Sequence, residues 1–218
     1  MRITVLGATG MAGTAVVNEA LSRGHEVTAV SRRRCHRVGA RLTSRLLDVS
    51  DVEGVAGLLT DSDAVVVALR PPAGHESDLA RLTMAVLDAA SRGRTPLLII
   101  GGAAPLNSPG NPSTLAIDDP TIVPPAWRDV AQASLDQFRA CQAHSYEGWV
   151  YLSPPAIFGP GDVTGAYRRG TTTLLRDAHG ASRISPEDLA LAVVDELERP
   201  GDQQHFTVVT SMPEAEAD

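Results

Sequence analysis

One glycine-rich motif constrains the fold more than any other part of this sequence: Gly7-Ala8-Thr9-Gly10-Met11-Ala12-Gly13. It follows an apolar run over residues 3–6 that has the length of a buried strand, and an amphipathic stretch over residues 11–23 begins inside it. Side-chain-free positions let the backbone pass close to a diphosphate, whose charge is met by free N–H groups and by the helix dipole. The order strand, loop, helix and second strand predicts a nucleotide-binding loop, and the alternative is a purely structural turn.

Strand-length apolar runs alternate along the chain with longer amphipathic segments, which is typical of a parallel sheet covered by helices. We expect strands over residues 3–6, 26–31, 45–48, 64–69, 97–100, 149–153 and 205–210, with helices in the intervals. The predicted fold class is α/β, a Rossmann-like, doubly wound and mostly parallel sheet with helices on both faces. We expect a single domain over residues 1–211 and an acidic tail over residues 212–218.

Three local signals mark helix ends. Gly24 is placed to stop the first helix in the left-handed conformation. Ser50 precedes Glu53 by three residues and predicts a capping box in which the serine accepts from the backbone. Ser185 is followed by Pro186, which suits the first position of a helix because no donor is lost there.

Two segments depart from the alternation, residues 101–125 and residues 158–182. The first is rich in glycine, proline and serine, and the second predicts a small hairpin through Thr164-Gly165-Ala166-Tyr167-Arg168. Each follows a predicted strand. Because ligands of open parallel sheets bind outside the carboxyl ends of the strands, both segments are expected to form the substrate side of the domain.

Composition excludes several classes of function. The chain contains no lysine, so neither Schiff-base chemistry nor the lysine-containing phosphate loop of nucleoside triphosphatases can be built. A net charge of -7 argues against a nucleic-acid partner. The six histidines are scattered without ligand spacing, so no metal site is expected. No apolar stretch predicts a signal peptide or a membrane span, and we therefore expect a cytoplasmic protein without a membrane partner.

The cofactor is indicated at the end of the second predicted strand, where an acidic side chain would bind the ribose hydroxyls of NAD. The sequence there is Ser31-Arg32-Arg33-Arg34 instead. A hydroxyl and guanidinium groups suit the 2′-phosphate of NADP, so NADP(H) is preferred over NAD(H), with Arg32 as the main contact. The alternative is a solvated arginine cluster.

These motifs resemble the atypical short-chain dehydrogenase/reductases, and more narrowly the NAD(P)H-binding NADH-flavin reductases and biliverdin-IXβ/flavin reductases. The resemblance covers nearly the whole chain. Besides the glycine loop it rests on Leu47-Asp48-Val49, Gly101-Gly102-Ala103, Tyr151-Leu152-Ser153-Pro154-Pro155, Thr164-Gly165-Ala166-Tyr167-Arg168 and Ser182-Arg183-Ile184-Ser185 followed by Glu187-Asp188-Leu189-Ala190.

The resemblance implies roles for individual positions. Asp48 and Val49 match adenine contacts, although they would equally serve a helix-capping turn. The other matches lie beneath the diphosphate or near the nicotinamide. The full predicted cofactor site is Gly7, Thr9, Gly10, Met11, Ala12, Gly13, Ser31, Arg32, Arg33, Asp48, Val49, Ala68, Leu69, Gly102, Pro154 and Pro155.

Residues that differ from the family pattern restrict the reactions that we expect of this protein. Gly102 stands where relatives often have a serine, and Ala156 replaces a histidine of the biliverdin branch, so bile-pigment reduction is not expected. A tyrosine whose pKa is lowered by lysine, the usual proton donor, cannot exist in a lysine-free chain. Flavins and quinones delocalise the charge of an arriving hydride and take a proton from water, so we expect such an acceptor.

Possible helpers in that reaction are Tyr167, His75 and Ser153, each of which could equally have only a structural role. Two further readings stay open: a non-catalytic NADP(H)-binding redox sensor, and a reductase or epimerase that tailors a natural product. The sequence leaves the oligomeric state open.

Overall fold

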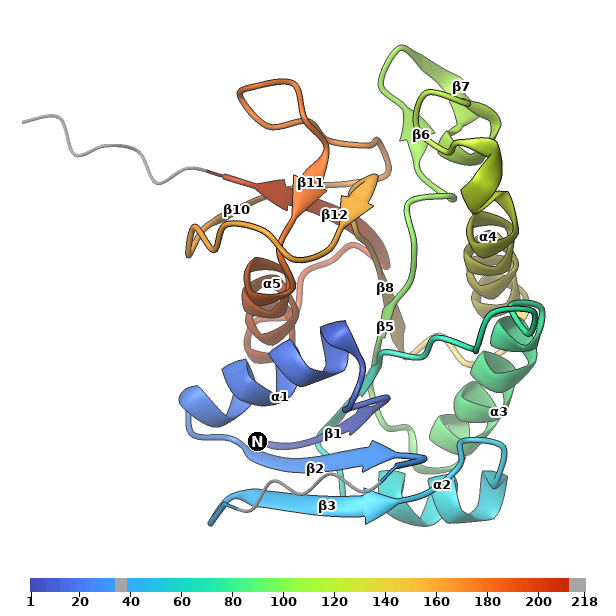
Figure 1. Ribbon diagram of the computed structural model, residues 1–218. Coiled ribbons are helices and arrows are strands. Elements are labelled where there is room, and N and C mark those ends of the chain that lie inside the picture. The colour runs from blue at the N-terminus through green and yellow to red at the C-terminus, as the bar shows by residue number, and fades with distance from the viewer. Residues whose placement is uncertain (34–38, 212–218) are drawn as a thin grey trace, which may run out of the picture.

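The computed structural model describes residues 1–33 and 39–211 and is built around one large sheet (Figure 1). Eight strands lie in the order β10-β12-β8-β5-β4-β1-β2-β3, all parallel except the edge strand β10. Their bounds are β1 (Arg2–Leu6), β2 (Glu26–Ser31), β3 (Leu42–Leu46), β4 (Ala64–Val67), β5 (Leu97–Ile100), β8 (Trp149–Ser153), β10 (Tyr167–Gly170) and β12 (His205–Thr210). The chain runs outward from β1 to β3 and then returns to the other side of β1 with β4. This reversal places a ligand crevice at the carboxyl ends of β1 and β4.

Helices cover both faces of this sheet. They are α1 (Met11–Ser22), α2 (Val52–Thr60), α3 (Asp78–Gly93), α4 (Arg128–Ala143) and α5 (Pro186–Glu198), with two 3₁₀ turns, η1 (Ala116–Asp118) and η2 (Pro125–Trp127). α1 and α5 pack together on one face, and α2, α3 and α4 pack side by side on the other. The predicted doubly wound α/β fold is therefore confirmed. No helix within the described ranges combines the length and apolar character needed to cross a bilayer.

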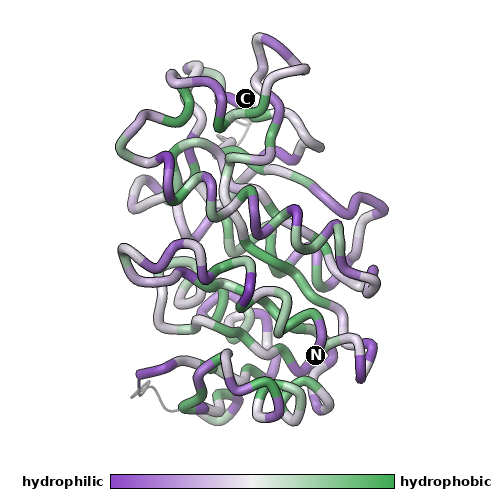
Figure 2. Tube along the Cα trace, turned by 90° about the vertical axis from the view of Figure 1, so that its right-hand side faces the viewer, coloured by the Kyte–Doolittle hydropathy of each residue, from purple (hydrophilic) through white to green (hydrophobic). Residues whose placement is uncertain are grey.

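The core consists of two apolar layers separated by the sheet. Along β4, Val66 joins the layer under α1 and α5, whereas Val65 and Val67 join the layer under α2 to α4. Each fully buried valine contributes about 1.5–3 kcal/mol relative to an exposed one. Figure 2 shows the hydrophobic parts of the trace concentrated along the strands in the middle of the molecule, with hydrophilic parts at the periphery.

Two predicted strands were misplaced. β3 covers residues 42–46 and not 45–48, because it pairs only with β2 and ends where that strand ends, at Ser31 opposite Leu46. Its exposed residues lack the apolar pattern that marks a buried strand. β4 stops at Val67 and does not reach residue 69. Its neighbour β1 ends opposite it at Leu6, where Gly7 turns away with φ of 87°.

The helix-end signals were correct except at α2. Gly24 has φ of 85°, as predicted for a left-handed residue beyond α1, and the Ser185 hydroxyl caps α5 by accepting from Asp188 N. The capping box at Ser50 is wrong, because the cap of α2 is Asp51, whose carboxylate accepts from Gly54 N at 3.0 Å.

The hairpin predicted in residues 158–182 is also wrong. β10 leaves this segment to pair antiparallel with β12 in the main sheet, and β9 (Ile157–Phe158) pairs parallel with β11 (Arg183–Ile184). The turn between β9 and β10 is held by α5, because the buried Asp188 carboxylate accepts hydrogen bonds from the backbone N–H groups of Thr164 and Gly165 at 3.1 and 3.0 Å. A hairpin-like antiparallel pair does occur in the segment 101–125, between β6 (Asn107–Ser108) and β7 (Asn111–Leu115).

Candidate functional site

The glycine loop lies between the end of β1 and the start of α1, and two of its glycines are required by backbone contacts. A Cβ on Gly7 would lie 2.2 Å from the carbonyl oxygen of Ala68, and a Cβ on Gly13 would lie 2.2 Å from the carbonyl oxygen of Gly7. Gly10 differs, because it is exposed and its nearest neighbour would lie 3.3 Å from a Cβ. The protein therefore leaves the outer side of Gly10 open to a ligand.

The loop presents unused backbone donors. The N–H groups of Met11, Ala12 and Gly13 form the first turn of α1, and none of them reaches an acceptor among the described residues. No acidic side chain stands in that turn. Free donors and the positive end of the helix dipole together favour an anion such as a diphosphate.

On one side of this loop is a cleft of about 310 Å³, which we name the arginine cleft. Four predicted cofactor residues line it: Arg32, Asp48, Val49 and Leu69. The remaining lining residues are Ser50, Arg70, Pro71, Pro72, His75, Asp78, Arg81 and Leu82. The chain thus brings together the ends of β2, β3 and β4 with the start of α3.

Electrostatics in the arginine cleft favour a charged Asp48. The backbone N–H and the hydroxyl of Ser50 donate to its carboxylate at 2.9 and 2.8 Å, and these bonds hold the pKa of Asp48 below its usual value despite some burial. Arg32 and Arg81 lower that pKa further. Asp48 is thus held as an acceptor for a donor group of a ligand.

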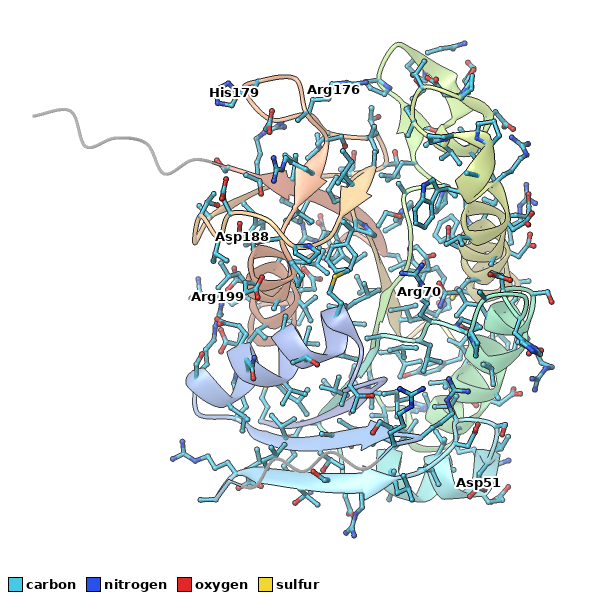
Figure 3. All side chains as sticks on the ribbon, viewed as in Figure 1. Asp51, Arg70, Arg176, His179, Asp188 and Arg199 are labelled. Atoms are coloured by element: carbon cyan, nitrogen blue, oxygen red, sulfur yellow. The ribbon has the colours of Figure 1, made fainter. Side chains whose placement is uncertain are left out.

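Sequence reasoning missed two arginines in this cleft. Arg70 directly follows Leu69, and Figure 3 shows it on the segment that leaves β4, near the centre of the molecule. Its position next to a predicted contact could have identified it. Arg81 lies on α3 and donates to Asp78 at 3.2 Å, and only the folded chain brings it to the cleft.

A second cleft of about 400 Å³ opens on the other side of the glycine loop. The lining residues are Thr9, Gly10, Met11, Thr14, Ala15, Asn18, Pro160, Gly161, Val163, Pro186 and Glu187. Thr9, Gly10 and Met11 were predicted as cofactor residues, and the wall formed by residues 160–163 belongs to the segment 158–182 that was expected on the substrate side. The turn held by Asp188 brings this wall over α1.

Five other predicted cofactor residues, Ser31, Arg33, Gly102, Pro154 and Pro155, lie outside both clefts. The Ser31 hydroxyl is buried and donates to the carbonyl oxygen of Arg33, and Arg33 is exposed outside the arginine cleft. Gly102 follows β5, while Pro154 and Pro155 are buried directly after β8. Arg34 lies outside the described residues, so its predicted contribution to this cluster stays a prediction.

The three candidate helpers do not meet at one point. His75 lines the arginine cleft, 3.6 Å from the Asp78 carboxylate. Ser153 is completely buried, and its hydroxyl lies 2.9 Å from Nε2 of His205. Burial lowers the pKa of His205 to about 4, so this imidazole is neutral at pH 7. His75 thus lies in the arginine cleft, and the Ser153 hydroxyl is already paired with a buried imidazole.

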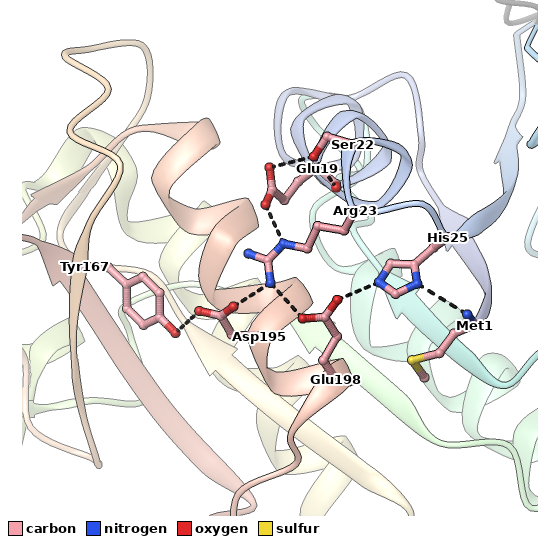
Figure 4. A network of polar contacts seen from close by, with 8 residues as sticks. All are labelled: Met1, Glu19, Ser22, Arg23, His25, Tyr167, Asp195 and Glu198. Carbon is pink, nitrogen blue, oxygen red and sulfur yellow. Dashed lines mark hydrogen bonds and ion pairs between the residues drawn. The ribbon is translucent and has the colours of Figure 1, made fainter.

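Tyr167 belongs to a polar network at the far end of α1 (Figure 4). Its hydroxyl donates to Asp195 at 2.7 Å, and burial together with this bond raises its pKa. The centre of the network is Arg23, which donates to Asp195 at 2.6 Å and to Glu198 at 2.9 Å. Because α1 begins at the glycine loop and Arg23 follows its last turn, Tyr167 is a structural residue remote from that loop.

Replacing Arg23 with methionine is expected to lower the free energy of unfolding by about 1–2 kcal/mol at pH 7, because three carboxylates, those of Glu19, Asp195 and Glu198, lose their ion pair with it. Burial alone would raise the pKa values of Asp195 and Glu198, but their hydrogen bonds, including those from Arg23, hold both below their usual values. The stabilisation is therefore complete above the unfolded pKa of about 4 and is lost as the pH falls through the lower folded values. Urea unfolding of wild type and variant from pH 7 to pH 2 measures this loss, and the two free energies of unfolding should converge as the pH falls.

The matched control is Arg2→Met, which removes an exposed ion pair with Asp63 and should cost less than about 0.5 kcal/mol. Equal losses for the two variants at pH 7 would contradict the structural role of the Arg23 network.

The reversal of strand order, the glycine loop with free donors and the two flanking clefts together define a dinucleotide-binding α/β protein. The chain belongs to the NAD(P)H-binding family, whose model matches residues 7–200.

Similar proteins extend over the whole chain. The Bacillus subtilis (strain 168) protein YwnB, which is named as uncharacterized, is 34% identical over 215 residues, covering 96% of this chain and 99% of YwnB. A Streptococcus pneumoniae structure, named a putative NADH-flavin reductase, is 28% identical with a TM-score of 0.87 and coverages of 96% and 99%. A Bacteroides thetaiotaomicron structure, named a putative epimerase, is 31% identical with a TM-score of 0.86 and coverages of 98% and 99%.

Proposed function

We propose that this protein is an NADP(H)-dependent oxidoreductase that passes a hydride from NADPH to a flavin, a quinone or a similar conjugated acceptor. The observation that carries the proposal is the glycine loop, whose free amides begin α1 just beyond the carboxyl end of β1, while the arginine cleft lies at the carboxyl ends of β2, β3 and β4. A dinucleotide bound across this loop would have its adenosine end in the arginine cleft and its nicotinamide beside Gly102, Pro154 and Pro155.

The preference for NADP over NAD rests on the charges of the arginine cleft. Arg32 and Arg70 line it, and neither donates a hydrogen bond to any described residue. Their guanidinium groups are free to hold a 2′-phosphate, while Asp48 accepts from the adenine amine. Arg81 adds charge but is already paired with Asp78.

The acceptor class follows from the chemistry that the described side chains offer. His75, Ser153 and Tyr167 are engaged elsewhere, so none of them would protonate an alkoxide next to the nicotinamide. NADPH, when bound, supplies the hydride. The protein then needs to hold a flat acceptor within contact of the nicotinamide, and proximity provides most of the acceleration. The name of the Streptococcus pneumoniae relative agrees with this acceptor class, although it specifies NADH.

Steady-state consumption of NADPH with a panel of free flavins and quinones tests the proposal. We expect turnover with at least one conjugated acceptor and little turnover with simple ketones. Tight NADPH binding without turnover on any acceptor would favour a redox sensor instead. Turnover restricted to a sugar or natural-product carbonyl would favour the tailoring alternative, which the name of the Bacteroides thetaiotaomicron relative suggests.

A further inference from the structure

Trp127 lies at the end of η2, at the point from which α4 begins. Seven residues later on this helix, Ser134 faces the end of β5, since a Cβ on Gly102 would lie 2.9 Å from the Ser134 Cβ. Ala131, between them, packs into the small cluster that contains Ala104. Residues four and seven apart share one helix face, so Trp127, the cap residue before α4, stands at the N-terminal end of the face that covers Gly102. It stands about 10 Å further along the helix axis, beyond the end of the sheet.

The indole of Trp127 is exposed on a rigid support. Trp127 is 56% exposed. Among the residues described, its side chain belongs to no core cluster, contacts no other aromatic ring and makes no hydrogen bond. Its backbone is nevertheless fixed, because Trp127 N donates to the carbonyl oxygen of Pro124 at 2.9 Å and Pro125 begins the turn. An exposed aromatic ring held on a stiff turn loses little entropy when a ligand covers it.

Exposed apolar side chains gather at this end of the sheet. Six large apolar side chains in the described ranges are exposed: Met1, Met11, Leu46, Trp127, Ile157 and Val163. Four of them follow the carboxyl end of a central strand, namely Met11 after β1, Trp127 after β5, and Ile157 and Val163 after β8. Met11 and Val163 also line the cleft beside the glycine loop. Exposed apolar side chains that share a cleft, as Met11 and Val163 do, are typical of a surface that binds an apolar ligand.

We infer that Trp127 is the platform on which the flat ring system of the hydride acceptor stacks, and that this ring system is an isoalloxazine. The inference rests on the proposed function and deepens it. In the proposed function the nicotinamide lies beside Gly102, and a planar acceptor that contacts it there and extends toward the start of α4 would stack on the indole. A three-ring acceptor spans more of the distance between Gly102 and Trp127 than a two-ring quinone does.

Trp127→Leu and Trp127→Phe form the matched pair of variants, because leucine keeps an apolar side chain without a ring whereas phenylalanine keeps a ring. With riboflavin, we expect Trp127→Leu to raise both the KM and the Kd measured on NADP⁺-loaded protein about tenfold, with a smaller change in kcat. Trp127→Phe should stay within about threefold of wild type. With menadione, a two-ring quinone, the loss in Trp127→Leu should be smaller. The Kd for NADPH should not change in either variant.

Equal weakening in both variants, or no weakening in either, would overturn the inference, as would failure of NADP⁺-loaded wild type to bind riboflavin or menadione. A larger loss for menadione than for riboflavin would reject the isoalloxazine. Failure of the proposed function gives a different result: riboflavin binds with the expected dependence on residue 127, but NADPH is not oxidised. Leu46→Ala, which removes a 62% exposed side chain on the edge strand β3, should leave all these values unchanged.

Discussion

Replacing Gly10 with alanine is expected to raise the Kd for NADPH about a hundredfold, a loss of about 2.7 kcal/mol, while the fold is retained. Gly10 has φ of -76° and an exposed backbone, so the protein accepts a methyl group there with a small shift of the Gly7 carbonyl oxygen, which would lie 3.3 Å from the added Cβ. That methyl group would occupy the space through which a diphosphate approaches the amides of Met11 and Ala12. Isothermal titration calorimetry measures the affinity, and thermal unfolding checks that the melting temperature falls by only a few degrees.

Two further glycine variants separate ligand contact from folding. Gly7→Ala places a Cβ 2.2 Å from a backbone oxygen and should impair folding itself. Gly57 lies on the exposed side of α2, and no atom lies within 4 Å of the Cβ that an alanine would add there. Gly57→Ala should therefore lower neither the stability of the protein nor its affinity for NADPH. If Gly10→Ala binds NADPH as wild type does, the diphosphate does not cross this loop.

Replacing Arg32 with alanine is expected to weaken NADPH binding about 10- to 100-fold and to leave NADH binding unchanged, because a charge-assisted hydrogen bond contributes about 1.5–3 kcal/mol. Arg70→Ala should have the same selectivity with a similar loss, since Arg70 lines the same cleft without donating a hydrogen bond to a described residue. Calorimetric titrations of both nucleotides at two salt concentrations give the affinities, and the NADPH advantage should shrink as salt rises.

Arg199→Ala is the matched control, because Arg199 is an exposed arginine at the end of α5, far from Arg70 in Figure 3. Arg199→Ala should change neither the affinity for NADPH nor the affinity for NADH. Equal binding of NADH and NADPH by wild type, together with an unchanged NADPH affinity in Arg32→Ala, would overturn the NADP assignment. The arginines would then form a solvated surface cluster.

Local features of this protein could be predicted from the sequence. The glycine loop is one continuous segment whose flanking strand and helix carry their own periodicities, so its place in the fold follows from the order of residues alone. The buried strands β5 and β8 were predicted with correct bounds for the same reason. The edge strand β3 was not, because its exposed residues carry no apolar signal.

Features that depend on which elements meet could not be predicted in this way. Arg81 reaches the arginine cleft only because α3 packs next to the end of β4, and no local pattern contains that information. Tyr167 was placed near the substrate because its segment follows a central strand. The structure instead adds it to the sheet edge and turns its hydroxyl toward Asp195. Sequence position alone does not give the direction of a side chain in a segment without regular periodicity.

The contact between Gly102 and α4 restricts how this protein can diverge. A serine at position 102 would bring a Cβ to 2.7 Å from the Ser134 hydroxyl oxygen and 2.9 Å from the Ser134 Cβ. A serine at position 102 therefore does not fit beside an unchanged Ser134 unless the helix moves. The two positions form an epistatic pair, so a lineage or an engineer that introduces a hydroxyl at the end of β5 must also shrink residue 134. The order of these two steps decides whether the intermediate folds.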